Sequence, residues 1–96
     1  MLKPKKMVPG SIVSLRILNG DELIARLKEE NNEGVTLTYP MVFTVTPDSA
    51  GVVPWFALGD TSLVNIKASH IFSMVPAKLV AAQEYIDNMS KIESNA

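Results

Sequence analysis

The sequence predicts an all-β fold, a small and strongly bent five-stranded open barrel, with a C-terminal α-helix. Apolar and polar residues alternate with a period of two in several segments between residues 12 and 75. Turn-forming clusters rich in Gly, Pro, Asn and Asp separate these segments. From Pro76 onward the hydrophobic period changes to 3.6, which is typical of a helix. About five strands, two of them long and bent, can curl into one small barrel.

The first two predicted strands form a hairpin. Residues 12–18 and 22–28 each alternate apolar and polar side chains, as half-buried strands do. Asn19-Gly20 lies between them, and both residue types tolerate the positive φ that a two-residue type I′ turn requires. The polar segment 29–34 then predicts the next turn.

The third predicted strand, residues 35–46, is the longest and contains a proline. Every second residue from Val35 to Val45 is apolar or aromatic. Pro40 cannot donate a hydrogen bond to a neighbouring strand, so we expect the strand to bend, bulge or lie at an edge there. After a turn at residues 47–51, the segments 52–58, 63–67 and 71–75 complete the predicted β structure.

Trp55 and Phe56 are adjacent within the predicted strand 52–58, so one aromatic ring would lie on each face. In a small β fold, aromatic residues belong more often to the core or to a subunit interface than to a stacking platform for bases. One of the two rings must leave the core, and we expect it at an interface between subunits.

The predicted helix runs from about Pro76 to Ile92, and Pro76 suits its first turn. Its apolar stripe would consist of Leu79, Ala82, Ile86 and Met89, with Val80 and Tyr85 beside the stripe. The predicted organisation is a basic flexible arm at residues 1–10, the barrel at residues 11–75 and a helix at residues 76–93 that packs on the barrel.

The composition indicates one small globular domain. The chain has 96 residues, of which 47% are hydrophobic and 20% charged, as in a folded protein rather than a disordered one. The absence of cysteine excludes disulfides and thiolate zinc sites. The formal net charge is −1, but Lys3, Lys5 and Lys6 lie at the start, so the rest of the chain is mildly acidic. A dedicated DNA-binding domain would carry a large excess of Lys and Arg.

The sequence predicts neither a secretory signal nor a membrane span. Pro9 and Gly10 interrupt the apolar stretch that follows the lysines. The longest apolar run, residues 50–58, is far shorter than the roughly 18 residues that suggest a spanning helix. We therefore expect a cytoplasmic protein with no membrane partner.

Two motifs resemble those of the Sm-like family, which includes the bacterial Hfq proteins. Residues 13–27 resemble the first Sm motif, with an apolar strand, an Asn-Gly turn and a small residue, Ala25, in the second strand. Residues 66–74 resemble the second motif, in which an apolar residue, a basic residue, a glycine and two polar residues precede an apolar strand. The likeness spans residues 12–75 and is nearest to divergent, phage-type Sm-like (LSm) proteins with helical C-terminal extensions.

The resemblance implies a five-stranded open barrel that assembles into a homo-oligomeric ring of roughly five to seven subunits with closed cyclic symmetry. In such rings the fourth strand of one subunit pairs with the fifth strand of its neighbour. Here that pairing would join the region 52–67 to residues 71–75. The resemblance also implies binding of single-stranded RNA near the pore, in an RNA chaperone or RNA metabolism role.

The sequence departs from the family pattern in both loops that hold RNA. Where the family has Asp, any residue, an aromatic, an apolar residue and Asn, residues 32–36 read Asn-Glu-Gly-Val-Thr, without the stacking aromatic. The other loop has Lys67-Ala68 in place of Arg-Gly, which keeps the charge but loses the planar guanidinium. We therefore expect weak and salt-sensitive RNA binding.

Five residues are the candidate RNA contacts, namely Lys67, His70, Ser69, Thr36 and Asn32. Lys67 needs only charge and reach to contact a phosphate. Ser69, Thr36 and Asn32 can hydrogen-bond the edge of a base, but they are also ordinary turn residues. His70 is the only histidine, so it lacks companions for a metal site and is either a polar loop residue or an RNA contact.

The sequence contains no motif for catalysis. It has no Gly-x-x-x-x-Gly-Lys phosphate loop, no Gly-x-Ser-x-Gly and no cysteine nucleophile, so we expect neither an enzyme nor a cofactor. Two alternatives to the RNA-binding ring stay open. One is a structural or protein-interaction ring that has lost RNA binding, and the other is an SH3-like or Tudor-like peptide-binding monomer.

Overall fold

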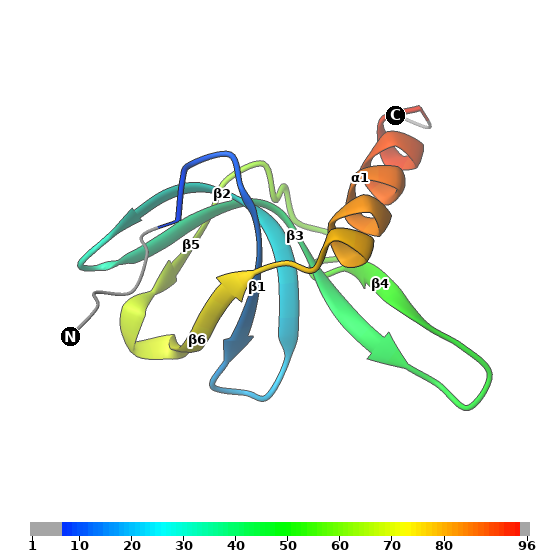
Figure 1. Ribbon diagram of the computed structural model, residues 1–96, viewed down its shortest axis with the longest axis horizontal. Coiled ribbons are helices and arrows are strands. Elements are labelled where there is room, and N and C mark those ends of the chain that lie inside the picture. Colours follow the sequence, from blue (N-terminus) through cyan, green and yellow to red (C-terminus); the bar gives the residue numbers. More distant parts are fainter. Residues whose placement is uncertain (1–6, 95–96) are drawn as a thin grey trace.

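The computed structural model describes residues 7–94, with side chains to residue 91, and is mostly antiparallel β-sheet with one C-terminal helix (Figure 1). Its elements are β1 (Ile12–Ile17), β2 (Glu22–Asn31), β3 (Gly34–Val45), β4 (Ala50–Pro54), β5 (Val64–Lys67), the 3₁₀ turn η1 (Ala68–His70), β6 (Ile71–Pro76) and α1 (Leu79–Ser94). The prediction of β structure followed by a helix is confirmed. Six strands replace the expected five, because residues 55–63 leave the sheet between β4 and β5.

The strands follow the order β4-β3-β2-β1-β6, and β5 pairs with β3. β3 holds two partners on one edge, since residues 34–37 pair with β5 and residues 41–45 pair with β4. β5 pairs only with β3, and β6 pairs only with β1, within the described part of the chain. β4 likewise pairs only with β3, so each of these three strands keeps one unpaired edge.

The β1–β2 hairpin lies where the sequence predicts it, but its turn is not type I′. The N–H of Gly20 donates to Ile17 O at 2.9 Å, and Gly20 has a φ of 94°. Asn19 does not share this positive φ. Instead its side-chain Oδ1 accepts a hydrogen bond from Asp21 N at 2.9 Å. Only one residue of the turn therefore requires the conformational freedom of glycine.

The β2–β3 hairpin is longer than predicted. β2 continues through the acidic residues to Asn31, and its partner in β3 is Gly34, so the turn consists of residues 32 and 33 alone. The polar residues 28–31 extend β2 rather than form a loop because they pair with the start of β3, whose other edge pairs with β5. Glu30 is the partly buried residue among them. Gly34 has a φ of 154°, and a Cβ at this position would overlap the carbonyl oxygen of Ile66 in β5. A side chain at position 34 would therefore exclude β5.

β3 bends at Tyr39 and Pro40, as the proline predicts. Tyr39 has a φ of 48°, and it stands between the half of β3 that pairs with β5 and the half that pairs with β4. This left-handed residue reverses which alternate side chains face inward. Leu37 lies in the inner core, whereas Met41 packs under the helix, so the uninterrupted alternation predicted for residues 35–46 is wrong.

The hydrophobic core lies inside the curved sheet and is formed mainly by β1, β2 and the first half of β3. Its buried residues are Val13, Leu15, Ile17, Leu23, Ala25, Leu27, Val35, Leu37 and Ile66. A second, smaller cluster of Ile24, Met41 and Tyr85 lies on the outer face beneath α1. β2 is therefore buried on both faces where the helix covers it.

α1 begins at Leu79 rather than in the region of Pro76, which is the last residue of β6. Its buried side chain is Tyr85, whose hydroxyl donates to Thr38 O at 2.9 Å and contacts Tyr39 O at 3.1 Å. Leu79 is 89% exposed, so the predicted stripe is wrong at this residue. Met89, which the stripe includes, does pack against the sheet, together with Ala81 and Tyr85. Tyr85 is buried in place of Leu79 because its hydroxyl reaches the carbonyl oxygens at the bend of β3. No helix in the described range is long and apolar enough to cross a membrane.

Candidate nucleic-acid interface

β5 separates two hollows on the surface, and three of its residues, Asn65, Ile66 and Lys67, line both of them. The first, here called the polar hollow, has a volume of about 380 Å³ and lies against the end of the β2–β3 hairpin. Its other lining residues are Glu29, Asn31, Glu33, Gly34, Val35 and Thr36. It therefore combines the Lys67 amine with two carboxylates.

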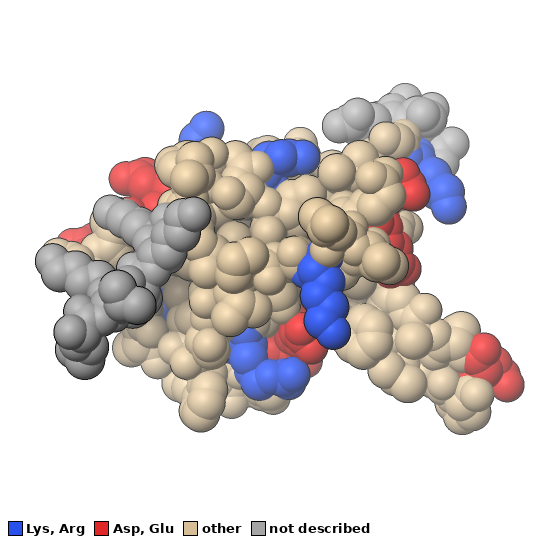
Figure 2. Space-filling model, viewed as in Figure 1, with Lys and Arg blue, Asp and Glu red and all other residues tan. Residues whose placement is uncertain are grey.

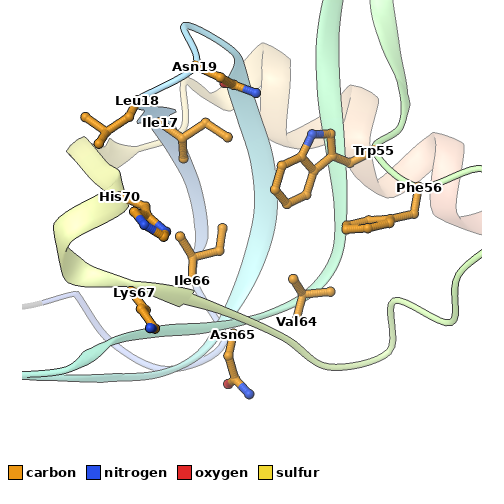
Figure 3. Close-up of a pocket in the computed structure, with 10 residues that line it drawn as sticks. All are labelled: Ile17, Leu18, Asn19, Trp55, Phe56, Val64, Asn65, Ile66, Lys67 and His70. Atoms are coloured by element: carbon orange, nitrogen blue, oxygen red, sulfur yellow. The ribbon is translucent and has the colours of Figure 1, made fainter.

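The second hollow, here called the aromatic hollow, has a volume of about 420 Å³ and lies on the opposite side of β5 (Figure 3). It is lined by Ile17, Leu18, Asn19, Trp55, Phe56, Val64, Asn65, Ile66, Lys67 and His70. Trp55 and Phe56 stand on one side, and His70 faces them from η1 across Ile66. None of its lining residues is acidic.

Trp55 and Phe56 do not lie on opposite faces of a strand, which contradicts the prediction for residues 52–58. β4 ends at Pro54, so both residues belong to the segment that leaves the sheet. Their ring centroids are 5.0 Å apart with an interplanar angle of 73°, an edge-to-face contact. Both rings border the same hollow.

Hydrogen bonds attach this segment to the bend of β3 near both of its ends. The N–H of Trp55 donates to Pro40 O at 3.1 Å, and the N–H of Tyr39 donates to Thr61 O at 2.7 Å. Within the segment, the Asp60 carboxylate accepts a hydrogen bond from Ser62 N at 2.9 Å. The hydrogen bonds from Ser62 lower the pKa of Asp60. The aromatic pair is therefore held on an anchored loop beside β5.

The five predicted contact residues do not form one cluster. Lys67 lines both hollows, His70 lines only the aromatic one, and Thr36 lines only the polar one. Asn32, in the β2–β3 turn, and Ser69, in η1, are exposed and line neither hollow. The strand β5 therefore divides the predicted set, with Lys67 as its common member.

Asn65 and Asn19 line the aromatic hollow but are not among the five candidate contacts predicted from the sequence. Asn65 Oδ1 accepts a hydrogen bond of 2.7 Å from the hydroxyl of Thr36, which pairs with Asn65 across the β3–β5 ladder. The Thr36 hydroxyl is thus already engaged within the protein. The Asn19-Gly20 motif predicted the turn that contains Asn19. Its place in the same hollow as Trp55 could not be predicted, because it depends on a contact between distant parts of the chain.

The charges around these hollows are sparse. Lys and Arg side chains on the face shown in Figure 2 are dispersed among uncharged residues and form no continuous basic patch. The one ion pair among the described residues joins Arg16 to Glu22 at 3.2 Å, so Lys67 has no such carboxylate partner there. An anion at this site would depend mainly on the single Lys67 amine.

Comparison with known proteins assigns no family to the chain. No protein-family model matches the sequence, and no curated protein is significantly similar to it. A functional assignment must therefore come from the motifs and from the geometry of the site.

Proposed function

We propose that this protein is a ring-forming, Sm-like protein that binds single-stranded RNA weakly through the β5–η1 region. In this proposal the curved sheet is an open barrel of the Sm type, and copies of the chain associate by cyclic symmetry. The observation that carries the proposal is that β5 and β6 each keep an unpaired edge, two of the three such edges in the described sheet.

The two free edges suit head-to-tail association. A strand edge exposes a row of N–H and C=O groups that can pair with another strand. If β6 of one copy pairs with β5 of the next, each copy uses a different edge on each side, and such a head-to-tail contact forms a ring when its rotation closes. Phe72, at the irregularity of β6, is 76% exposed, and Val75 is also exposed. Burial of these side chains against a second copy would add hydrophobic stabilisation.

The RNA part of the proposal is supported by Lys67 and its surroundings. Lys67 lies on β5, beside the edge that a ring would bring next to the neighbouring copy. Cyclic symmetry would therefore repeat one lysine per subunit around the ring, which compensates for the sparse charge of a single chain. Electrostatic contacts of this kind bind phosphates without regard to sequence and weaken with added salt.

Self-association is tested by measuring the mass of the purified full chain by native mass spectrometry at micromolar concentration. Phe72→Lys should shift the ring toward monomers because it places a charge in the β6 contact. Leu58→Lys is the matched control, since Leu58 is fully exposed in the segment between β4 and β5. A monomeric wild type, or equal effects of both variants, would contradict the proposed interface.

RNA binding is tested by titrating labelled U-rich and A-rich oligonucleotides at low salt and following fluorescence anisotropy. Lys67→Ala should weaken binding several-fold, whereas Lys78→Ala removes the same charge just before α1 and should have little effect. Glu29 and Glu33 favour one alternative, a ring without RNA binding, because they oppose phosphates in the polar hollow. A ring that binds neither oligonucleotide would establish that alternative.

A further inference from the structure

We propose that the aromatic hollow binds a nucleobase, with the attached phosphate next to Lys67. This inference rests on the proposed RNA-binding function and goes beyond it. It assigns the base to the opposite side of β5 from Asn32 and Thr36, the residues that the family pattern favours. It also assigns a binding role to Trp55 and Phe56.

The volume and lining of the aromatic hollow suit a planar, mostly apolar ligand. About 420 Å³ falls within the range of small-molecule sites, which bind mainly through apolar walls and a few polar groups. Ile17, Val64 and Ile66 supply the aliphatic walls. A single side chain from another protein, such as phenylalanine, would leave much of this volume empty, whereas a nucleotide fills more of it.

The aromatic pair offers a stacking surface of suitable shape. Trp55 and Phe56 meet at 73°, so a flat ring that stacks on one of them meets the other near its edge. Figure 3 shows both rings bordering the space that His70 closes from the other side. Stacking of bases on aromatic side chains is a general mode of single-strand recognition, because every base presents a π face.

Charge distinguishes this hollow from the polar one. Lys67 borders both, but the polar hollow also presents Glu29 and Glu33, which repel a phosphate. The aromatic hollow has no acidic lining residue. Lys67 leaves β5 on the same face as Asn65, away from the aromatic hollow, so its long side chain must turn back over the strand to contact the phosphate of a nucleotide whose base lies toward Trp55.

Few polar groups are available to distinguish one base from another. Asn65 points away from the hollow and accepts a hydrogen bond from Thr36, and Asn19 is hydrogen-bonded to Asp21. The indole N–H of Trp55 and the imidazole of His70 form no hydrogen bond with another described residue. Two such groups give little base selectivity, so purine and pyrimidine nucleotides should bind with similar affinity.

The first experiment uses the intrinsic fluorescence of Trp55, the only tryptophan in the chain. AMP and UMP are titrated into the wild-type protein at low salt, with ribose 5-phosphate as the probe that lacks a base. Saturable quenching by both nucleotides, without quenching by ribose 5-phosphate, supports a base beside Trp55. Equal responses to all three compounds, or no quenching by the nucleotides, would overturn the proposal.

Variants of Phe56 test whether stacking is responsible. Phe56→Leu keeps apolar volume but removes the aromatic face, and it should weaken UMP binding about 5- to 160-fold, the range for one base stack. Phe56→Tyr should restore binding. The matched control is Phe43→Leu on the β3–β4 hairpin, because Phe43 and Phe56 are 46% and 47% exposed. Equal affinities for Phe56→Leu and Phe43→Leu would refute a role for Phe56.

The oligonucleotide measurements separate this inference from the proposed function. If oligonucleotides bind in a Lys67-dependent manner but leave Trp55 fluorescence unchanged, the base site is wrong and the RNA-binding function stands. If neither oligonucleotides nor mononucleotides bind, both proposals fail. If Phe72→Ala yields a monomer that binds UMP more tightly than the wild type does, the neighbouring copy competes for the hollow, and a nucleobase site in the assembled ring is refuted.

Discussion

Replacement of Gly34 by alanine should destabilise the protein far more than replacement of another glycine with positive φ. Gly34 begins β3 and pairs with Asn31 on one side and Lys67 on the other. Its added Cβ would overlap Ile66 O and lie 3.0 Å from Ala68 N, both of them backbone atoms that cannot rotate away. β5 would have to move outward, and Lys67 would move with it.

The size of the effect follows from two contributions. A backbone conformation that only glycine adopts easily costs a substituted residue about 1–3 kcal/mol. Displacement of β5 adds the loss of about two ladder hydrogen bonds, at about 1 kcal/mol each. The sum of about 3–5 kcal/mol is a large fraction of the roughly 5–15 kcal/mol typical of a folded domain. Gly20→Ala carries only the conformational cost, since no atom lies within 4 Å of its added Cβ.

The assay is urea unfolding followed by Trp55 fluorescence, performed at two protein concentrations so that dissociation and unfolding are separated. The unfolding free energy of Gly34→Ala should fall by at least about 2 kcal/mol more than that of Gly20→Ala, which corresponds to the displaced β5 ladder. Equal losses in the two variants would show that β5 does not depend on the missing Cβ at position 34, and the structural reasoning would be wrong.

The remaining predictions concern the contact between α1 and the sheet. Burial raises the pKa of Tyr85, so the neutral phenol contributes stability that is fully present below pH about 10 and is lost as pH rises toward the folded pKa. At pH 7, the unfolding free energy of Tyr85→Phe should be about 1 kcal/mol lower than that of the wild type, because Thr38 O loses its hydrogen-bond donor. Between pH 9 and 11, the unfolding free energy measured in urea should decline less steeply for the variant than for the wild type. Identical pH profiles would contradict the role of the hydroxyl. Met41→Ala should cost about 2–5 kcal/mol in the same assay, whereas Met74→Ala, at a partly buried position, should cost less.

The strands could be predicted where the sequence pattern depends on neighbouring residues alone. Buried residues alternate in residues 12–17 and 22–28 because one face of each strand packs on the same core. Ile24 is the exception, since it packs beneath α1. Pro40 correctly located the bend in β3, since its missing N–H acts at one position. The reversal of the inward face at Tyr39 was not predictable, because a positive φ at a tyrosine is uncommon. The backbone of Tyr39 is hydrogen-bonded here to residues distant in the sequence, its N–H to Thr61 O and its carbonyl to the Tyr85 hydroxyl.

In α1, contacts with a distant part of the chain determine which side chain is buried. Periodicity alone placed Leu79 and Ile86 in the apolar stripe, and by hydrophobicity they are better candidates than tyrosine. Tyr85 is buried instead, since its hydroxyl reaches the carbonyls of Thr38 and Tyr39 and its ring fills the space above Met41. A helical wheel carries no information about those carbonyls, which lie more than forty residues earlier in the chain.

The same bend connects the fold to the candidate site. Because β3 turns at Tyr39, one edge of a single strand accepts both β5 and β4, and the chain between these two strands must cross the bend. Its two backbone hydrogen bonds there, from Trp55 to Pro40 and from Tyr39 to Thr61, hold the crossing segment against β3. This attachment places Trp55 and Phe56 beside β5 and within reach of a ligand at Lys67. The motifs indicated Lys67 and Thr36 through their spacing in the sequence, whereas the aromatic pair became a candidate only once the bend defined which hollow it borders.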